Sequence, residues 1–287
     1  MKKIDVPIVV QPGSQPGEED GAELDYPDLP KEVWTYAMPV VPEPEEIEGL
    51  EPALATLGKL QRELTAYRVG APVQILELDD LDEANLDLVN QVFGHGEVSI
   101  RYEGLTTARI QESVLAGVWR VQYLEAGPDG REQVARDVIE VADIPSLVSA
   151  GVFDGAADKV SFRLEDVPPG NSAPLLTEIN DKLGERDAGD AAHVINLSLL
   201  PHTEEDLQFL TDKLGDGPVV ILSRGYGNCR ITATATRNVW WVQYFNSQDT
   251  LILNTIEISR VPEVACAAQE DIDDSAERLA EILEVYQ

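Results

Sequence analysis

The chain has 287 residues, of which 43% are hydrophobic, and this is enough apolar material for two ordinary domains or one larger repeated body. Its 53 acidic residues outnumber its 21 basic residues and give a formal net charge of −32. This charge repels nucleic-acid phosphates and anionic membrane surfaces, so we expect neither as a partner. It would attract basic peptides, although it could equally serve solubility alone.

Cysteine content and hydropathy indicate where the protein is found. Cys229 and Cys266 form no Cys-x-x-Cys pair, which is typical of a protein in a reducing cytoplasm. The sequence contains no apolar run of the ~20 residues that span a membrane. Its first apolar stretch is soon broken by Pro12 and makes a poor export signal. We therefore expect a cytoplasmic protein without membrane insertion.

Residues 1–50 predict an acidic, proline-rich arm with only three basic residues. Its two apolar pieces, at residues 6–10 and 33–41, could pack on the body of the protein or on a neighbouring molecule. From residue 54 the spacing of leucines predicts a helix, and an apolar strand begins at Val73. A second helix follows, and the chain then alternates between strands and turns up to Pro145.

The same series of elements is expected a second time. The sequence from Gly94 to Tyr123 matches Gly215 to Tyr244 without a gap, at an offset of 215 − 94 = 121 residues. The strand at Val73 matches Val194 at the same offset. Four residues are missing from the next hairpin of the second copy, so later strands match at an offset of 117.

The sequence therefore predicts an α+β fold with two tandem repeats, each helix, strand, helix and an antiparallel meander of about four strands. The first repeat covers residues 51–150, a connection covers 151–170, and the second repeat covers 171–287. The second repeat ends in a helix that Asp273, Asp274 or Ser275 could cap. We expect this helix to pack on the body.

Recognisable catalytic patterns are missing from the sequence. None of the three histidines belongs to a nucleophile–base signature, and the glycines around Gly225 lack the lysine of a phosphate-binding loop. We expect no catalytic residue and no cofactor. Cys229 and Cys266 are the candidates if a metal or cluster binds, although a buried free cysteine is the more usual outcome.

The two copies differ around the turn at Gly104 or Gly225 and in the strand that starts at Trp119 or Trp240. Glu103 of the first copy corresponds to Arg224 of the second, and Arg120 corresponds to Trp241. A large aromatic side chain on a face whose counterpart is charged indicates an interface, either with a partner or with the other lobe. Arg, Tyr and Trp anchor such interfaces. We therefore predict a partner-binding face that consists of Arg224, Tyr226, Asn228, Arg230, Arg237 and Trp241.

These same segments carry a family resemblance. "ILSRGYGNCRITATATRNVWWVQYFNSQDTLILNTIEI" from Ile221, together with "IQESVLAGVWRVQY" from Ile110, resembles the HupH/HyaF/HoxQ family of hydrogenase expression/formation proteins. The resemblance extends over about residues 94–270. It implies a cytoplasmic accessory protein for maturation of [NiFe] uptake hydrogenases, one that chaperones the iron–sulfur small-subunit precursor with its twin-arginine leader. A thioredoxin-like accessory protein is a further implied partner. The family has no established catalytic residues to transfer.

Two other functions are consistent with the residues. In the first, Cys229 and Cys266 carry iron or an iron–sulfur cluster. In the second, the chain is an enzyme that acts on the hydrogenase precursor, although no nucleophile–base pair or metal motif supports that function.

Overall fold

The computed structural model describes residues 47–168, 170–185, 191–224 and 228–286. The chain divides into two units, Met1–Glu32 and Val33–Gln287, and all described residues belong to the second unit. The predicted arm, apart from its last few residues, and Tyr226 lie outside the described residues.

Residues 51–141, which we call the first half, form helix, strand, helix and four strands in that order. The second helix starts at a side-chain cap, because Asp82 Oδ1 accepts a hydrogen bond from the Asn85 amide at 2.9 Å. The elements are α1 (Glu51–Ala66), β1 (Gln74–Glu77), α2 (Glu83–Phe93), β2 (Val98–Glu103), β3 (Thr107–Glu112), β4 (Val118–Ala126) and β5 (Glu132–Val141).

Residues 172–258, the second half, repeat this order, and Thr203 and Asp206 form a capping box at the start of their second helix. The elements are α4 (Ser172–Glu185), β6 (His193–Asn196), η3 (Leu197–Leu199), α5 (Glu204–Leu214), β7 (Asp216–Ser223), β8 (Asn228–Thr234), β9 (Val239–Phe245) and β10 (Leu251–Ile258). The short helices α3 (Ser146–Ser149) and η2 (Leu164–Asp166) lie between the halves, and η4 (Glu263–Ala265) and α6 (Gln269–Glu284) follow them. The predicted α+β class is confirmed.

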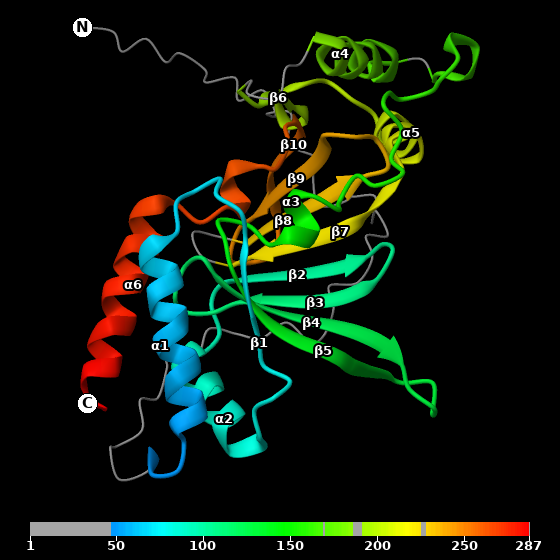
Figure 1. The fold of residues 1–287 in the computed structure, drawn as a ribbon. Helices are drawn as coiled ribbons and strands as arrows, with labels where there is room; N and C mark the ends of the chain where they lie inside the picture. The colour runs from blue at the N-terminus through cyan, green and yellow to red at the C-terminus, as the bar shows by residue number, and fades with distance from the viewer. Residues whose placement is uncertain (1–46, 169, 186–190, 225–227, 287) are drawn as a thin grey trace, which may run out of the picture. The chain divides into compact units, whose positions relative to one another are not determined.

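The ten strands of the described residues form one antiparallel sheet, in the order β1-β5-β4-β3-β2-β7-β8-β9-β10-β6 (Figure 1). The halves meet where β2 pairs with β7, and there Ile100 lies opposite Ile221. These two isoleucines correspond to each other at the sequence offset of 221 − 100 = 121. The register therefore relates the halves by an approximate two-fold axis between Ile100 and Ile221.

One predicted alignment is wrong by two residues. Leu76 of β1 lies opposite Ile139, and Ile195 of β6 lies opposite Ile256, so β1 corresponds to β6 at an offset of 195 − 76 = 119. The sequence comparison predicts an offset of 121. The second half inserts η3 between its first strand and α5, and this extra turn accounts for the difference.

Two fully buried tryptophans hold the equivalent strands β4 and β9 to the segment that follows each half. Trp119 Nε1 donates a hydrogen bond to the Ala142 carbonyl at 2.9 Å. Trp240 Nε1 donates to the Ser259 carbonyl at 3.2 Å. An indole N–H buried in the core needs such an acceptor, because a missing partner costs free energy.

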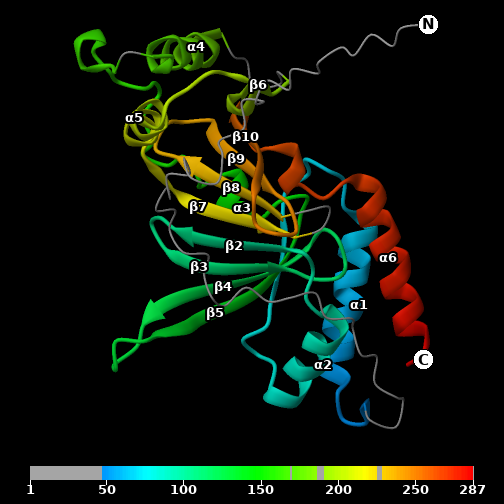
Figure 2. The ribbon, with the colours of Figure 1, turned by 180° about the vertical axis from the view of Figure 1, so that it is seen from behind.

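The C-terminal helix packs on the body, as expected. In α6, Ile272 and Leu279 are fully buried, and the helix lies beside α1 in both views (Figures 1 and 2). It starts at Gln269, earlier than the predicted caps at residues 273–275, and its N-cap, Ala268, makes no side-chain cap hydrogen bond. Its position therefore depends on apolar burial against α1 and the core.

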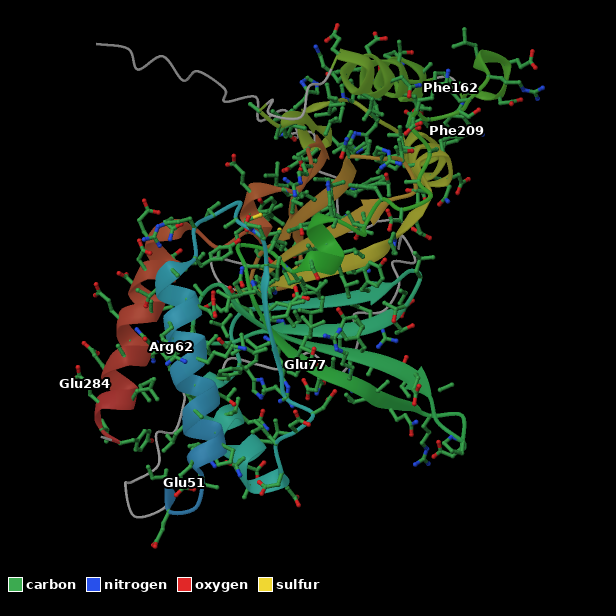
Figure 3. The ribbon with its side chains drawn as sticks, viewed as in Figure 1. Glu51, Arg62, Glu77, Phe162, Phe209 and Glu284 are labelled. Carbon is green, nitrogen blue, oxygen red and sulfur yellow. The ribbon has the colours of Figure 1, made fainter. Side chains whose placement is uncertain are left out.

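A second apolar cluster lies under α4 and α5. Leu176 and Leu210 from these helices pack with Ile256 of β10, and all three are fully buried. Phe162 and Phe209 pack on the edge of this cluster (Figure 3). The face of the second half that carries Trp241 is therefore covered in part by α4 and α5.

Candidate functional site

Strand register shows which residues of the predicted partner-binding face lie together. Asn228 lies opposite Phe245 and Arg230 lies opposite Gln243 on the β8–β9 ladder. Paired residues point to the same side of a sheet, and residues two apart along a strand share that side. Asn228, Arg230 and Trp241 therefore share one face of the sheet.

Arg224 and Arg237 occupy different places. Arg224 directly follows β7 and is exposed, and its amide donates a hydrogen bond to the Glu97 carbonyl at 3.1 Å. Arg237 lies in the turn between β8 and β9, at the opposite end of these strands, where its Nε donates to Asp158 Oδ1 at 3.0 Å. The structure therefore does not bring Arg237 together with Arg224 and Asn228.

The indole of Trp241 has a structural explanation in the comparison of the halves. In the first half, Arg120 Nε donates to Asp137 Oδ1 at 3.0 Å. In the second half, Trp241 replaces Arg120, and Asn254 replaces Asp137 at the offset of 254 − 137 = 117. Trp241 Nε1 donates to Asn254 Oδ1 at 2.5 Å. The cation and the carboxylate are thus replaced together, which avoids leaving one charge buried without the other.

The side chain of Trp241 is only partly open to solvent. The residue is half-buried and packs against the cluster under α5. Gln122 Nε2 donates to Asp137 at 3.0 Å, whereas the equivalent Gln243 Nε2 has no hydrogen-bond partner among the described residues. A part for Trp241 in partner binding stays a prediction.

An exposed aliphatic surface adjoins the predicted face. The amide of Asn254 donates to Ser198 Oγ at 2.8 Å and so holds η3 beside β10. Leu199 is 80% exposed and Ile252 is 61% exposed. We call this surface the β10 patch, and it consists of Leu199, Leu200, Leu251 and Ile252.

The β10 patch lies at the same end of the strands as Asn228, because Leu251 and Asn228 both pair with Phe245. None of its four residues belongs to the predicted partner-binding face. The signal was present at the offset of 117, where Ile252 replaces Ala135 of the first half. Large exposed aliphatic residues that gather in one place indicate an interaction site more strongly than scattered ones do.

Glu112, at the end of β3, is a further residue that sequence reasoning missed. Burial, and after it the nearby charges of Glu97 and Asp271, raise the pKa of this carboxyl to about 8, while the hydrogen bond from the Gly117 amide opposes the shift. At the offset of 121 the second half has Ala233, which is fully buried. In the sequence, the only signal was a glutamate at a strand position where the other copy has alanine.

The two cysteines are both free thiols. Cys229 is buried on β8, and Cys266 directly follows η4. Burial raises the pKa of each thiol to about 12. Because metals bind the thiolate, this environment disfavours metal binding by either cysteine at neutral pH. Within the described part of the chain, no three His, Cys, Asp or Glu side chains converge closely enough to hold a metal ion.

Among the described residues, no helix combines the length and the apolar character needed to cross a membrane.

A protein-family model matches the chain twice. The model describes the C-terminal conserved region of the HupH hydrogenase expression protein, and it matches residues 51–162 and 170–286. The two matches correspond to the two halves with their flanking segments.

Curated proteins of similar length match nearly the whole chain. "Hydrogenase expression/formation protein HupQ" of Azotobacter chroococcum mcd 1 is 49% identical over 96% of this chain and 95% of its own. "Hydrogenase expression/formation protein HoxQ" of Azotobacter vinelandii is 47% identical over 99% of both chains. "Hydrogenase-1 operon protein HyaF" of Escherichia coli K12 is 29% identical over 94% of this chain and 93% of its own.

A solved structure also matches. "Hydrogenase expression protein HupH from Thiobacillus denitrificans ATCC 25259" is 34% identical and covers 40% of this chain and 95% of its own, with a TM-score of 0.36.

The Trp241–Asn254 exchange can be tested by restoring the pair of the first half. We expect Trp241→Arg alone to lower the free energy of unfolding by roughly 3 kcal/mol, because the new cation lies under α5 without a carboxylate. Asn254→Asp in the same chain should recover at least about 1 kcal/mol of that loss. Urea denaturation of both single variants and the double variant measures the coupling. If the effects of the two single substitutions on the free energy of unfolding simply add, the two positions are not coupled, and this result would contradict the explanation.

Glu112 should make stability depend on pH. Its folded-state pKa of about 8 lies above the ordinary value of 4.5, so the folded protein holds a proton that the unfolded chain releases. Stability should therefore fall as the pH rises from about 5 to 8, and stay reduced above that range. Glu112→Gln should raise the melting temperature at pH 8.5 by several degrees, since 1 kcal/mol corresponds to about 2–4 °C in domains of 150–250 residues.

At pH 5 the same substitution should have little effect on the melting temperature. The exposed Glu281→Gln on α6 makes the same change in net charge and is the matched control. Calorimetry at both pH values separates the two variants. A Glu112→Gln effect that is equal at pH 5 and pH 8.5 would rule out the titration.

Proposed function

Because the chain belongs to the HupH hydrogenase expression protein family, we propose that it is a non-catalytic accessory protein of hydrogenase maturation. In this proposal it holds the iron–sulfur small-subunit precursor, with its twin-arginine leader, until the precursor is ready for export. The relatives are named as hydrogenase expression/formation proteins, which supports the general role. The finer role as a chaperone depends on the surfaces of this chain.

The β10 patch is the observation that carries the chaperone role. An export leader has a positively charged segment followed by an apolar segment of about 7–15 residues. Leu199 and Ile252 offer an exposed aliphatic surface for the apolar segment. The net charge of −32 favours approach of the positively charged segment. The apolar segment of a leader therefore matches the β10 patch, and its positively charged segment matches the net negative charge of the chain.

The proposal places the chain in the cytoplasm, where a precursor that retains its leader is found. A thioredoxin-like accessory protein is a second proposed partner. The proposal assigns no catalytic step to the chain, and the support for this comes from the family names and from the lack of a nucleophile–base signature in the sequence.

A role as an iron or iron–sulfur carrier is the second candidate, and it depends on Cys229 and Cys266. The raised pKa of both thiols works against it, because neither is ionised at neutral pH in the free protein. Iron and sulfide analysis of anaerobically purified chain separates the candidates. Stoichiometric iron that is lost in Cys229→Ser would favour the carrier.

The chaperone role is tested by affinity capture from cells that make the hydrogenase. We expect the tagged full-length chain to retain the small-subunit precursor with its leader. Ile252→Asp should lower this capture at least about tenfold, because an aspartate in the contact would lose its hydration against an apolar segment. Quantitative mass spectrometry of the eluates measures the change.

Val134→Asp is the matched control, because Val134 is an exposed aliphatic residue of β5 and corresponds to Leu251 at the offset of 117. This variant should retain the precursor. Equal capture by all three proteins would exclude the β10 patch as the binding surface. Recovery of only the mature large subunit by the wild-type chain would overturn the proposed function itself.

A further inference from the structure

An open pocket lies at the end of the β2–β7 pair where β2 finishes and β7 begins. Its volume is about 290 Å³. Three segments far apart in the sequence form it: the end of β2 with the following turn, the turn after α3, and the start of β7. The side chains that matter for its chemistry are Tyr102, Glu103, Leu105, Asp154, Asp216 and Pro218.

Close backbone packing shapes this pocket. A Cβ on Gly104 would lie 2.5 Å from Tyr102 Oη, and a Cβ on Gly217 would lie 2.6 Å from the Thr234 carbonyl oxygen. Neither glycine can therefore be replaced without a shift of its neighbours. Tyr102 Oη also donates a hydrogen bond to the Gly151 carbonyl at 3.4 Å, which ties the turn after α3 to β2.

The described residues do not neutralise all the negative charge of the pocket. Glu103 accepts a hydrogen bond from Arg101 Nε at 2.8 Å. Asp154 and Asp216 are exposed, and no basic side chain of the described residues forms a salt bridge with either carboxylate. Two carboxylates without a salt bridge that line one cavity favour a positively charged occupant, since a cation is attracted to both.

The lining also selects the kind of cation. Within the described residues, these carboxylates do not converge closely enough to form a group that could hold a metal ion. Leu105 is 90% exposed, and with Pro218 it gives the pocket an apolar wall. Arginine combines an aliphatic stem with a planar guanidinium that can bind two carboxylates at once. An arginine side chain therefore matches both walls of the pocket.

We infer that this pocket binds an arginine side chain of the partner, with Asp154 and Asp216 holding the guanidinium and Leu105 covering the stem. The inference rests on the proposed function, because the basic segment of an export leader is the expected source of the arginine. The pocket would be a second contact with the partner, and it lies at one end of the β2–β7 pair while Arg224 lies at the other. Arg224 corresponds to Glu103 of the pocket at the offset of 121. The two ends of the pair thus carry opposite charges at equivalent positions.

The test uses the full-length chain and a dye-labelled peptide of serine and alanine that contains two adjacent arginines. A peptide with citrulline in place of both arginines keeps the size and removes the charge. Fluorescence anisotropy should show binding of the arginine peptide only. The chain with both Asp154→Asn and Asp216→Asn should bind it at least about tenfold more weakly, which corresponds to the loss of one charged hydrogen bond.

The control chain carries Asp87→Asn and Asp181→Asn, which remove two exposed carboxylates from α2 and α4. It should bind as tightly as the wild type. Equal weakening in both double variants would mean that only net charge matters and would overturn the inference. Equal binding of the citrulline peptide would also overturn it.

A further variant keeps both carboxylates and changes the apolar wall. Leu105→Ser should weaken binding of the arginine peptide severalfold, because the stem loses its apolar contact. Unchanged binding would contradict the position assigned to the stem. Capture of the precursor distinguishes a failure of the arginine pocket from a failure of the proposed function. If the wild-type chain captures the precursor but binds no arginine peptide, this inference fails and the proposed function stands.

Discussion

The pairing of β2 with β7 is the interaction on which the rest of the structure depends. It joins the two halves into one ten-stranded sheet and places Ile100 opposite Ile221. Because these residues correspond in sequence, the two ends of the β2–β7 pair are equivalent places in the fold, although they carry different residues. One end carries Arg224, and the other carries the pocket of Glu103 and Asp216. The β2–β7 pairing thus determines the positions of both Arg224 and the pocket.

Buried and exposed positions have diverged between the halves in different ways. The partly buried ion pair of Arg120 and Asp137 is replaced at both positions, by Trp241 and Asn254. The physical reason is the cost of leaving one charge without the other. At exposed positions no such coupling applies. Ile252 replaces Ala135 without a matching change, so surface differences between the halves are the better indicators of partner binding.

Apolar spacing was enough to predict the order of helices and strands, because each element must bury one face. It could not fix the register of β1 and β6. Side chains alternate with a period of two, so a shift of two residues keeps every side chain on its own face. The β2–β7 pairing also has no local signature, because its hydrogen bonds join residues more than a hundred positions apart. The pocket escaped prediction for the same reason, since Leu105, Asp154 and Asp216 come from three separate segments.

Native-state hydrogen exchange, followed residue by residue at increasing denaturant, tests most directly whether β2 and β7 make the halves one cooperative body. The amides of both strands should exchange only through global unfolding, with one common free energy of opening. Such a result would mean that neither half opens alone. Exchange of the β7–β10 amides at a clearly lower free energy, while β2–β5 stay protected, would contradict the central place given to this pairing.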